Sequence, residues 1–110
     1  MSKLESKDCI PCRGGIPPME EKKAKKFLRQ VSGWSLTANS KKIRKQFKFK
    51  NFIEAMAFVN KAAAIMELER HHSDILISYN KVTLTNYTHK IQGLHDNDFI
   101  LAAKIDKLKS

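Results

Sequence analysis

The apolar stripe of residues 52–70 most constrains what this chain can fold into. Apolar side chains recur there at helical spacing, Asn51 is positioned to cap the helix, and Glu54 follows as its reciprocal capping partner. The stripe is wide enough to cover a β-sheet, so its methionines are expected to pack in a core. A chain of 110 residues has room for one such core and therefore for one domain.

Two pairs of short alternating segments flank this central helix, and both pairs are typical of β-hairpins. The four strands are predicted at residues 34–37, 43–49, 76–79 and 82–88. Asn80 and Lys81 alone separate the second pair, a spacing that suits a tight turn. Two further helices are predicted, one over residues 19–32 before a left-handed Gly33 and one around residues 99–108.

The predicted order is α-β-β-α-β-β-α, and the fold class is α+β. Hairpins separated by helices form a four-stranded antiparallel sheet with three helices on one face, a two-layer domain over residues 19–110. Residues 1–18 contain no hydrophobic periodicity and end in a Gly/Pro-rich run, so they are expected to form a flexible leader. A sheet with two edges can pair with another copy, and a homodimer or homotetramer is expected.

Composition and charge narrow the classes of function. No segment approaches the roughly 20 apolar residues of a membrane span. Residues 1–7 lack the apolar core of a secretion signal, so no membrane partner and a cytoplasmic location are expected. Residues 1–50 hold 14 Lys/Arg against 4 Asp/Glu and carry the whole net charge of +10. This excess would attract nucleic acid, but it falls mostly on polar faces of predicted elements, so a solvated surface is favoured and nucleic-acid binding is the alternative.

The only two cysteines, Cys9 and Cys12, form a C-x-x-C pair within the Pro/Gly-rich leader. One such pair supplies two metal ligands, whereas a closed structural zinc site usually takes four. A thioredoxin-like redox pair would lie where a strand meets a helix. Two free thiols are therefore favoured, and a shared metal or a disulfide remains the alternative.

Three of the four histidines, His71, His72 and His89, lie within nineteen positions. Histidine has an ordinary pKa of about 6.5 and exchanges protons near neutral pH. The doublet is predicted at the end of the central helix, and His89 is predicted at the end of the last strand. Glu67 lies four residues before His71 on the same helical face, and Asp98 lies early in the last helix, so each can orient a ring. This arrangement favours a proton-transfer site.

A three-histidine zinc site and purely structural histidines are the alternatives to proton transfer. Neighbouring residues on a helix point about 100° apart, so His71 and His72 do not readily face one ion. No metal site is therefore predicted. The fourth histidine, His95, precedes the last helix and is expected to lie at the surface or to cap that helix.

The residues around the cluster resemble the pterin-4a-carbinolamine dehydratase family. The pattern is Glu67-x-x-x-His71-His72-Ser73, followed by Tyr79, Thr88-His89, Gly93-Leu94 and Asp98. The resemblance extends through Gly33-Trp34 and other flanking runs over about residues 20–108, and the cysteine-containing leader resembles that of extended family members.

The resemblance implies dehydration of a 4a-hydroxytetrahydropterin to a quinonoid dihydropterin, which recycles the cofactor of an aromatic amino acid hydroxylase. Such an elimination needs an acid for the departing hydroxyl and a base for the N5 proton, but no metal, redox centre or other cofactor. His71 and His89 are then the expected acid/base pair, while His72 binds and polarises the pterin ring. The expected substrate-binding residues are Glu67, Thr88, Asp98 and Trp34, and Trp34 fits a core position equally well.

Three positions depart from the family pattern. Ser73 stands where proline is commonest, Arg70 stands where a shorter residue is usual, and His95 replaces a Ser/Thr cap, so the last helix is expected to begin at Asp96. The family offers its own alternative, because animal members also act as dimerisation partners of a transcription factor. The complete histidine set favours the enzyme over a non-catalytic co-regulator.

Overall fold

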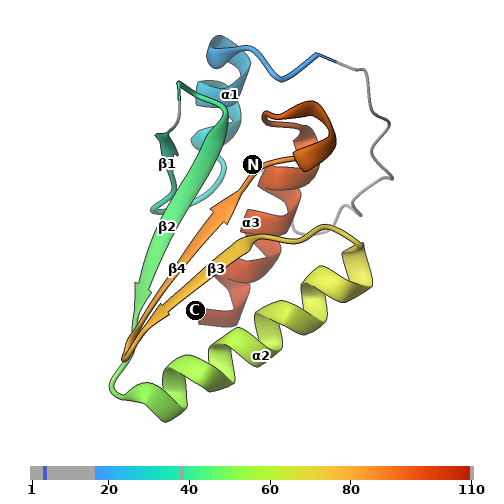
Figure 1. The fold of residues 1–110 in the computed structure, drawn as a ribbon. Coiled ribbons are helices and arrows are strands. Elements are labelled where there is room, and N and C mark those ends of the chain that lie inside the picture. The colour runs from blue at the N-terminus through green and yellow to red at the C-terminus, as the bar shows by residue number, and fades with distance from the viewer. Residues whose placement is uncertain (1–3, 5–16, 38, 110) are drawn as a thin grey trace.

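The protein is described by a computed structural model at residue 4 and over residues 17–37 and 39–109 (Figure 1). The elements are α1 (Glu21–Leu28), β1 (Ser35–Thr37), β2 (Lys42–Lys48), α2 (Phe52–Glu69), β3 (Asp74–Ser78), β4 (Lys81–Asn86), the 3-10 helix η2 (His89–Ile91) and α3 (Asp96–Lys109). The predicted α+β class and element order are confirmed. No helix in the described ranges combines the length and apolar character needed to cross a membrane.

The four strands form one antiparallel sheet in the order β1-β2-β4-β3. Alternate residues of β2 and β4 point inward, so that Phe47 lies opposite Val82 in a buried layer. These side chains share one core with Ala24, Phe58 and Leu101, which come from the three helices. The helices therefore pack on the same face of the sheet, as predicted.

The course of α2 decides where the histidine doublet lies. Asn51 caps the helix as predicted, because its Oδ1 accepts a hydrogen bond of 2.9 Å from the Glu54 N–H. The helix ends at Glu69, one residue before the predicted end, because Arg70 adopts a left-handed conformation with φ of 56°. The His71 N–H then donates to the Met66 carbonyl at 3.1 Å and closes the last turn. The doublet consequently follows the helix instead of forming its last turn.

Two further predicted boundaries are wrong. Helix α1 ends at Leu28 and not at residue 32, because the chain tightens into three-residue turns after it, with the Val31 N–H donating to the Leu28 carbonyl. Gly33 does adopt the expected left-handed conformation, with φ of 80°. The turn of the second hairpin is Tyr79–Asn80, one residue earlier than predicted, because Ser78 pairs with Lys81 across it.

The predicted leader lies almost wholly outside the described residues. Cys9 and Cys12 fall there, so the prediction of two free thiols stays a prediction. Leu4 is described and is only 3% exposed, and it belongs to the core. Where the described chain resumes, the Met19 N–H donates to the Leu94 carbonyl at 2.8 Å and attaches this segment beside the start of α3.

A candidate proton-transfer site

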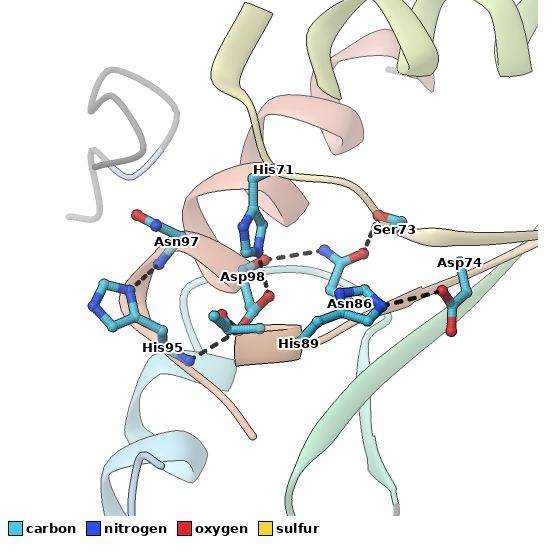
Figure 2. Close-up of polar contacts among 9 residues, drawn as sticks. His71, Ser73, Asp74, Asn86, His89, His95, Asn97 and Asp98 are labelled. Carbon is cyan, nitrogen blue, oxygen red and sulfur yellow. Dashed lines mark hydrogen bonds and ion pairs between the residues drawn. The ribbon is translucent and has the colours of Figure 1, made fainter. Parts of the chain in front are cut away.

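The predicted site residues other than Trp34 come together at one end of the sheet. Antiparallel pairing of Asp74 with Thr85 brings the start of β3 beside the end of β4. The doublet directly precedes β3, and His89 begins η2 three residues beyond β4, so His89 is not the strand end that was predicted. Asp98, from the first turn of α3, lies between them (Figure 2).

His71 and Asp98 form the buried centre of the site. His71 Nε2 lies 2.6 Å from Asp98 Oδ1, the histidine side chain is 10% exposed, and the aspartate is completely buried. The other carboxylate oxygen, Oδ2, accepts hydrogen bonds of 2.9 Å from the Thr88 hydroxyl and from the His95 N–H. These contacts compensate the burial of a charged carboxylate, which is costly when left unpaired.

The hydrogen bonds of Asp98 indicate which nitrogen of His71 is available to exchange a proton. An ionised carboxylate only accepts hydrogen bonds, so the proton between His71 and Asp98 belongs to the Nε2 of the ring. Nδ1 is then the ring atom left to take up or release a proton. A buried carboxylate on Nε2 also stabilises the imidazolium that forms when Nδ1 is protonated, as in a Ser-His-Asp triad.

Asp98 also completes the cap of α3. The helix begins at Asp96 as expected, and His95 supplies the cap, since its Nδ1 accepts from the Asn97 N–H at 3.1 Å. Asp98, the third helical residue, accepts from the His95 N–H in return. This is the reciprocal arrangement of a capping box with histidine in the usual Ser/Thr position. His95 is thus a structural residue whose bonds hold Asp98 in place.

Glu67 pairs with His72, although it was expected on the face of His71. His72 Nε2 lies 2.5 Å from Glu67 Oε2, and both side chains are more than half exposed. The left-handed Arg70 turns the chain away from the helical path, so the spacing of four residues no longer brings Glu67 to His71. An exposed pair of this kind orients a ring but adds little stability.

His89 has a carboxylate neighbour that the sequence pattern did not predict. Its Nε2 lies 3.7 Å from Asp74 Oδ1 with both side chains exposed, and its ring packs against Tyr87 with centroids 4.1 Å apart. Each histidine of the cluster therefore has a carboxylate beside it. Asp74 lies before the strand predicted at residues 76–79, and it is the pairing of Asp74 with Thr85 that brings it near the end of β4.

Trp34 is not brought into the cluster. Its Nε1 donates to Asp106 Oδ1 at 3.0 Å, and its ring packs edge-on against Phe47 in the core. Asp106 lies eight residues after Asp98, about 12 Å along α3 at 1.5 Å per residue. Tyr79 is also distant, at the opposite end of β3 in the hairpin turn. Thr88 does reach the site, through Asp98.

The acidic and basic groups of the site occur mainly in pairs. Within the described ranges, no three His, Cys, Asp or Glu side chains converge in a way that could hold a metal ion. Each pair places an imidazole beside a carboxylate, and the pairs of His72 and His89 are exposed whereas that of His71 is nearly buried. Such an arrangement can deliver one proton and remove another from a small molecule bound between the rings.

Fold and site together define a small α+β protein with three histidine–carboxylate pairs at one end of its sheet. The chain belongs to the pterin-4-alpha-carbinolamine dehydratase family, whose model matches residues 17–108. A provisionally named pterin-4-alpha-carbinolamine dehydratase of Halorhodospira halophila is 50% identical over 105 residues, which cover 96% of each chain. One of the same name from Rubrobacter xylanophilus is 41% identical over 108 residues, covering 98% of this chain and 100% of the relative.

Solved structures agree with this family. A crystal structure of a transcriptional coactivator/pterin dehydratase from Brucella melitensis superimposes with a TM-score of 0.80 at 30% identity. The match covers 84% of this chain and 99% of the other. The resemblance seen in the sequence and the predicted topology are both confirmed, and the chain is a member of a dehydratase family.

Proposed function

We propose that this protein dehydrates a 4a-hydroxytetrahydropterin to a quinonoid dihydropterin, with histidines as the acid and the base. Family membership supports the reaction class. The observation that carries the histidine roles is the buried pair of His71 and Asp98, with the exposed His89 nearby (Figure 2). Two imidazoles with carboxylate partners supply both proton transfers that an elimination of water requires.

Each of the two histidine rings carries one of the two proton transfers. One histidine donates a proton to the 4a-hydroxyl as the C4a–O bond breaks, and water leaves. The other histidine accepts the N5 proton, and the electron pair of the N5–H bond forms the new C4a=N5 double bond. The two histidines then return to their starting protonation states by exchanging protons with water. No net proton is gained or lost over the turnover. His71 acts through Nδ1 in this scheme, with Asp98 holding its Nε2–H.

His72 and Glu67 take the remaining roles of binding and polarisation. Both side chains are exposed beside His71, where a pterin ring can contact them. Thr88 acts through Asp98. An aromatic amino acid hydroxylase would supply the 4a-hydroxytetrahydropterin, since hydroxylation of its substrate leaves that species behind.

We also propose a homo-oligomer. Strand β3 is an edge of the sheet, and its Leu76 is 65% exposed; α2 additionally exposes Ile53 and Leu68 at 78% and 80%. Apolar strand edges and helix faces of this kind favour pairing with another chain. The same surfaces would suit the dimerisation role that is this family's alternative function.

The direct test is the formation of quinonoid dihydropterin from freshly generated 4a-hydroxytetrahydropterin, followed by its absorbance. The purified protein is expected to raise the first-order rate well above that of buffer, in proportion to protein concentration. A rate equal to that of buffer over the neutral pH range would contradict the proposed dehydratase and favour the alternative, a non-catalytic co-regulator.

A further inference from the structure

We propose that Asn86 is a positioning residue that sets the geometry of the His71–Asp98 pair from behind the site. This inference rests on the proposed function. Asn86 contacts no histidine in the hydrogen bonds of the site, and it is completely buried. It would act on catalysis only through the residues that it holds.

The position of Asn86 in β4 is unusual for an amide. Val82 and Leu84 precede it on the inward face of the same strand, and both are fully buried apolar residues. An amide in such a layer is costly unless its polar atoms are hydrogen-bonded. Among the described residues no buried side-chain nitrogen or oxygen lacks a partner, so the amide of Asn86 is satisfied.

The two ends of the amide join the two elements that carry the buried pair. Its Oδ1 accepts a hydrogen bond from the Ser73 hydroxyl, two residues after His71, and its Nδ2 donates to the backbone carbonyl of Asp98 at 3.0 Å (Figure 2). The backbone of Asn86 is itself paired with Ile43 in the interior of the sheet. One side chain fixed to the sheet therefore fastens both the segment after α2 and the first turn of α3.

This connection matters because His71 and Asp98 are 27 residues apart and lie on separate elements. Farther along α3, the Lys104 ammonium donates a hydrogen bond of 2.9 Å to the Glu69 carboxylate at the end of α2. The Asn86 amide links the segment after α2 to α3 at the end that carries the site. A displacement of about 1 Å between catalytic groups can cost on the order of 100-fold in rate. A second layer of hydrogen bonds is a usual way to prevent such displacement.

Ser73 is the partner that makes this link available. A proline there, the commonest residue in the family, would have no hydroxyl to donate, and the buried Oδ1 of Asn86 would lose its partner. The link through Asn86 Oδ1 therefore depends on the hydroxyl of Ser73.

The test compares Asn86→Leu, which keeps a similar volume without the amide, with the matched control Asn80→Ala. Asn80 also donates its Nδ2 to a backbone carbonyl, that of Phe49 at 2.9 Å, but at the opposite end of the β3–β4 hairpin. For Asn86→Leu, kcat of dehydration is expected to fall about 10- to 100-fold. KM should change little, and the pH profile of kcat should shift. Asn80→Ala should lower the melting temperature yet keep kcat per folded molecule.

Ser73 provides an independent arm if Asn86→Leu does not fold. Ser73→Ala should lower kcat and shift the pH profile, whereas Ser73→Thr, which keeps the hydroxyl, should restore both. A folded Asn86→Leu protein, or Ser73→Ala in its place, with the kcat and pH profile of the unmodified protein would overturn the inference.

One readout separates this inference from the proposed function. The 15N signals of the His71 ring report its tautomer and its bond to Asp98 without any substrate. They are expected to change in Asn86→Leu and to stay unchanged in Asn80→Ala. An inactive unmodified protein with this pattern would contradict the dehydratase and leave the positioning role standing, whereas unchanged His71 signals in Asn86→Leu would contradict the positioning role.

Discussion

The carboxylates beside the three histidines differ sharply in burial. Asp98 is completely buried and its two oxygens receive hydrogen bonds from three groups, whereas Glu67 and Asp74 are exposed. A buried, fully bonded carboxylate has a fixed position and stabilises a positive ring strongly, because water does not screen it. The three histidine–carboxylate pairs are therefore not equivalent, and substitution should reveal a ranking.

Asp98→Asn should be the more damaging of two matched carboxylate-to-amide changes. The amide can present an N–H to His71 Nε2, which favours the wrong tautomer, so kcat of dehydration should fall by about 1,000- to 10,000-fold. Glu67→Gln is the matched change at an exposed pair and should cost less than about tenfold. Steady-state kinetics on both folded variants, with circular dichroism for the fold, measures this ranking. Equal losses would show that burial of the carboxylate does not matter.

Element boundaries explain which parts of the site the sequence could predict. The histidine cluster and Asp98 were predicted from spacing, and a cap of the last helix was one of two alternatives predicted for His95, since these depend on local patterns. The pairing of Glu67 with His72 was not, because it depends on the left-handed turn at Arg70 after α2. Asp74 and Asn86 needed the register of β4 against its neighbours, which alternation within one strand does not specify.

The left-handed Arg70 gives a stability prediction for the end of α2. A residue with a Cβ is strained at φ of 56°, and glycine is not. Arg70→Gly should therefore raise the free energy of unfolding by up to about 1 kcal/mol, whereas the β-branched Arg70→Val should lower it by at least about 1 kcal/mol. Urea denaturation measures both. The opposite order would mean that the turn takes another conformation in solution.

Removing the cap at the start of α2 should lower stability without changing activity. Asn51→Ala removes the side-chain cap on the Glu54 N–H and should lower the free energy of unfolding by about 1 kcal/mol. The cap lies at the far end of the helix from the doublet, so kcat per folded molecule should not change. A loss of kcat beyond the unfolded fraction would show that this end of the helix contributes to the site.

At the scale of the whole molecule, the sheet order determines which surfaces remain for other chains. The order β1-β2-β4-β3 leaves β3 at an edge with its five residues exposed, three of them apolar. The opposite edge, β1, is only three residues long. The longer apolar edge is the better surface for pairing with a second copy, and the start of β3 lies beside the candidate site.

Leu76→Lys should weaken this association, because it places a charge in the middle of the exposed edge strand. Sedimentation velocity over a range of concentrations should show a smaller species than for the unmodified protein. Ser35→Lys, on the edge strand β1, is the matched control and should leave the mass unchanged. A monomeric unmodified protein at high concentration would contradict the proposed homo-oligomer.

His71 and His89 are proposed to carry the two proton transfers of dehydration, and single-turnover kinetics measure the contribution of each. Quinonoid dihydropterin formation would be followed by stopped-flow absorbance for the unmodified protein, His71→Ala and His89→Ala. Strong acceleration is expected from the unmodified protein, with a loss of about 100- to 10,000-fold in each folded variant. A folded variant of either histidine that keeps the full rate would contradict it.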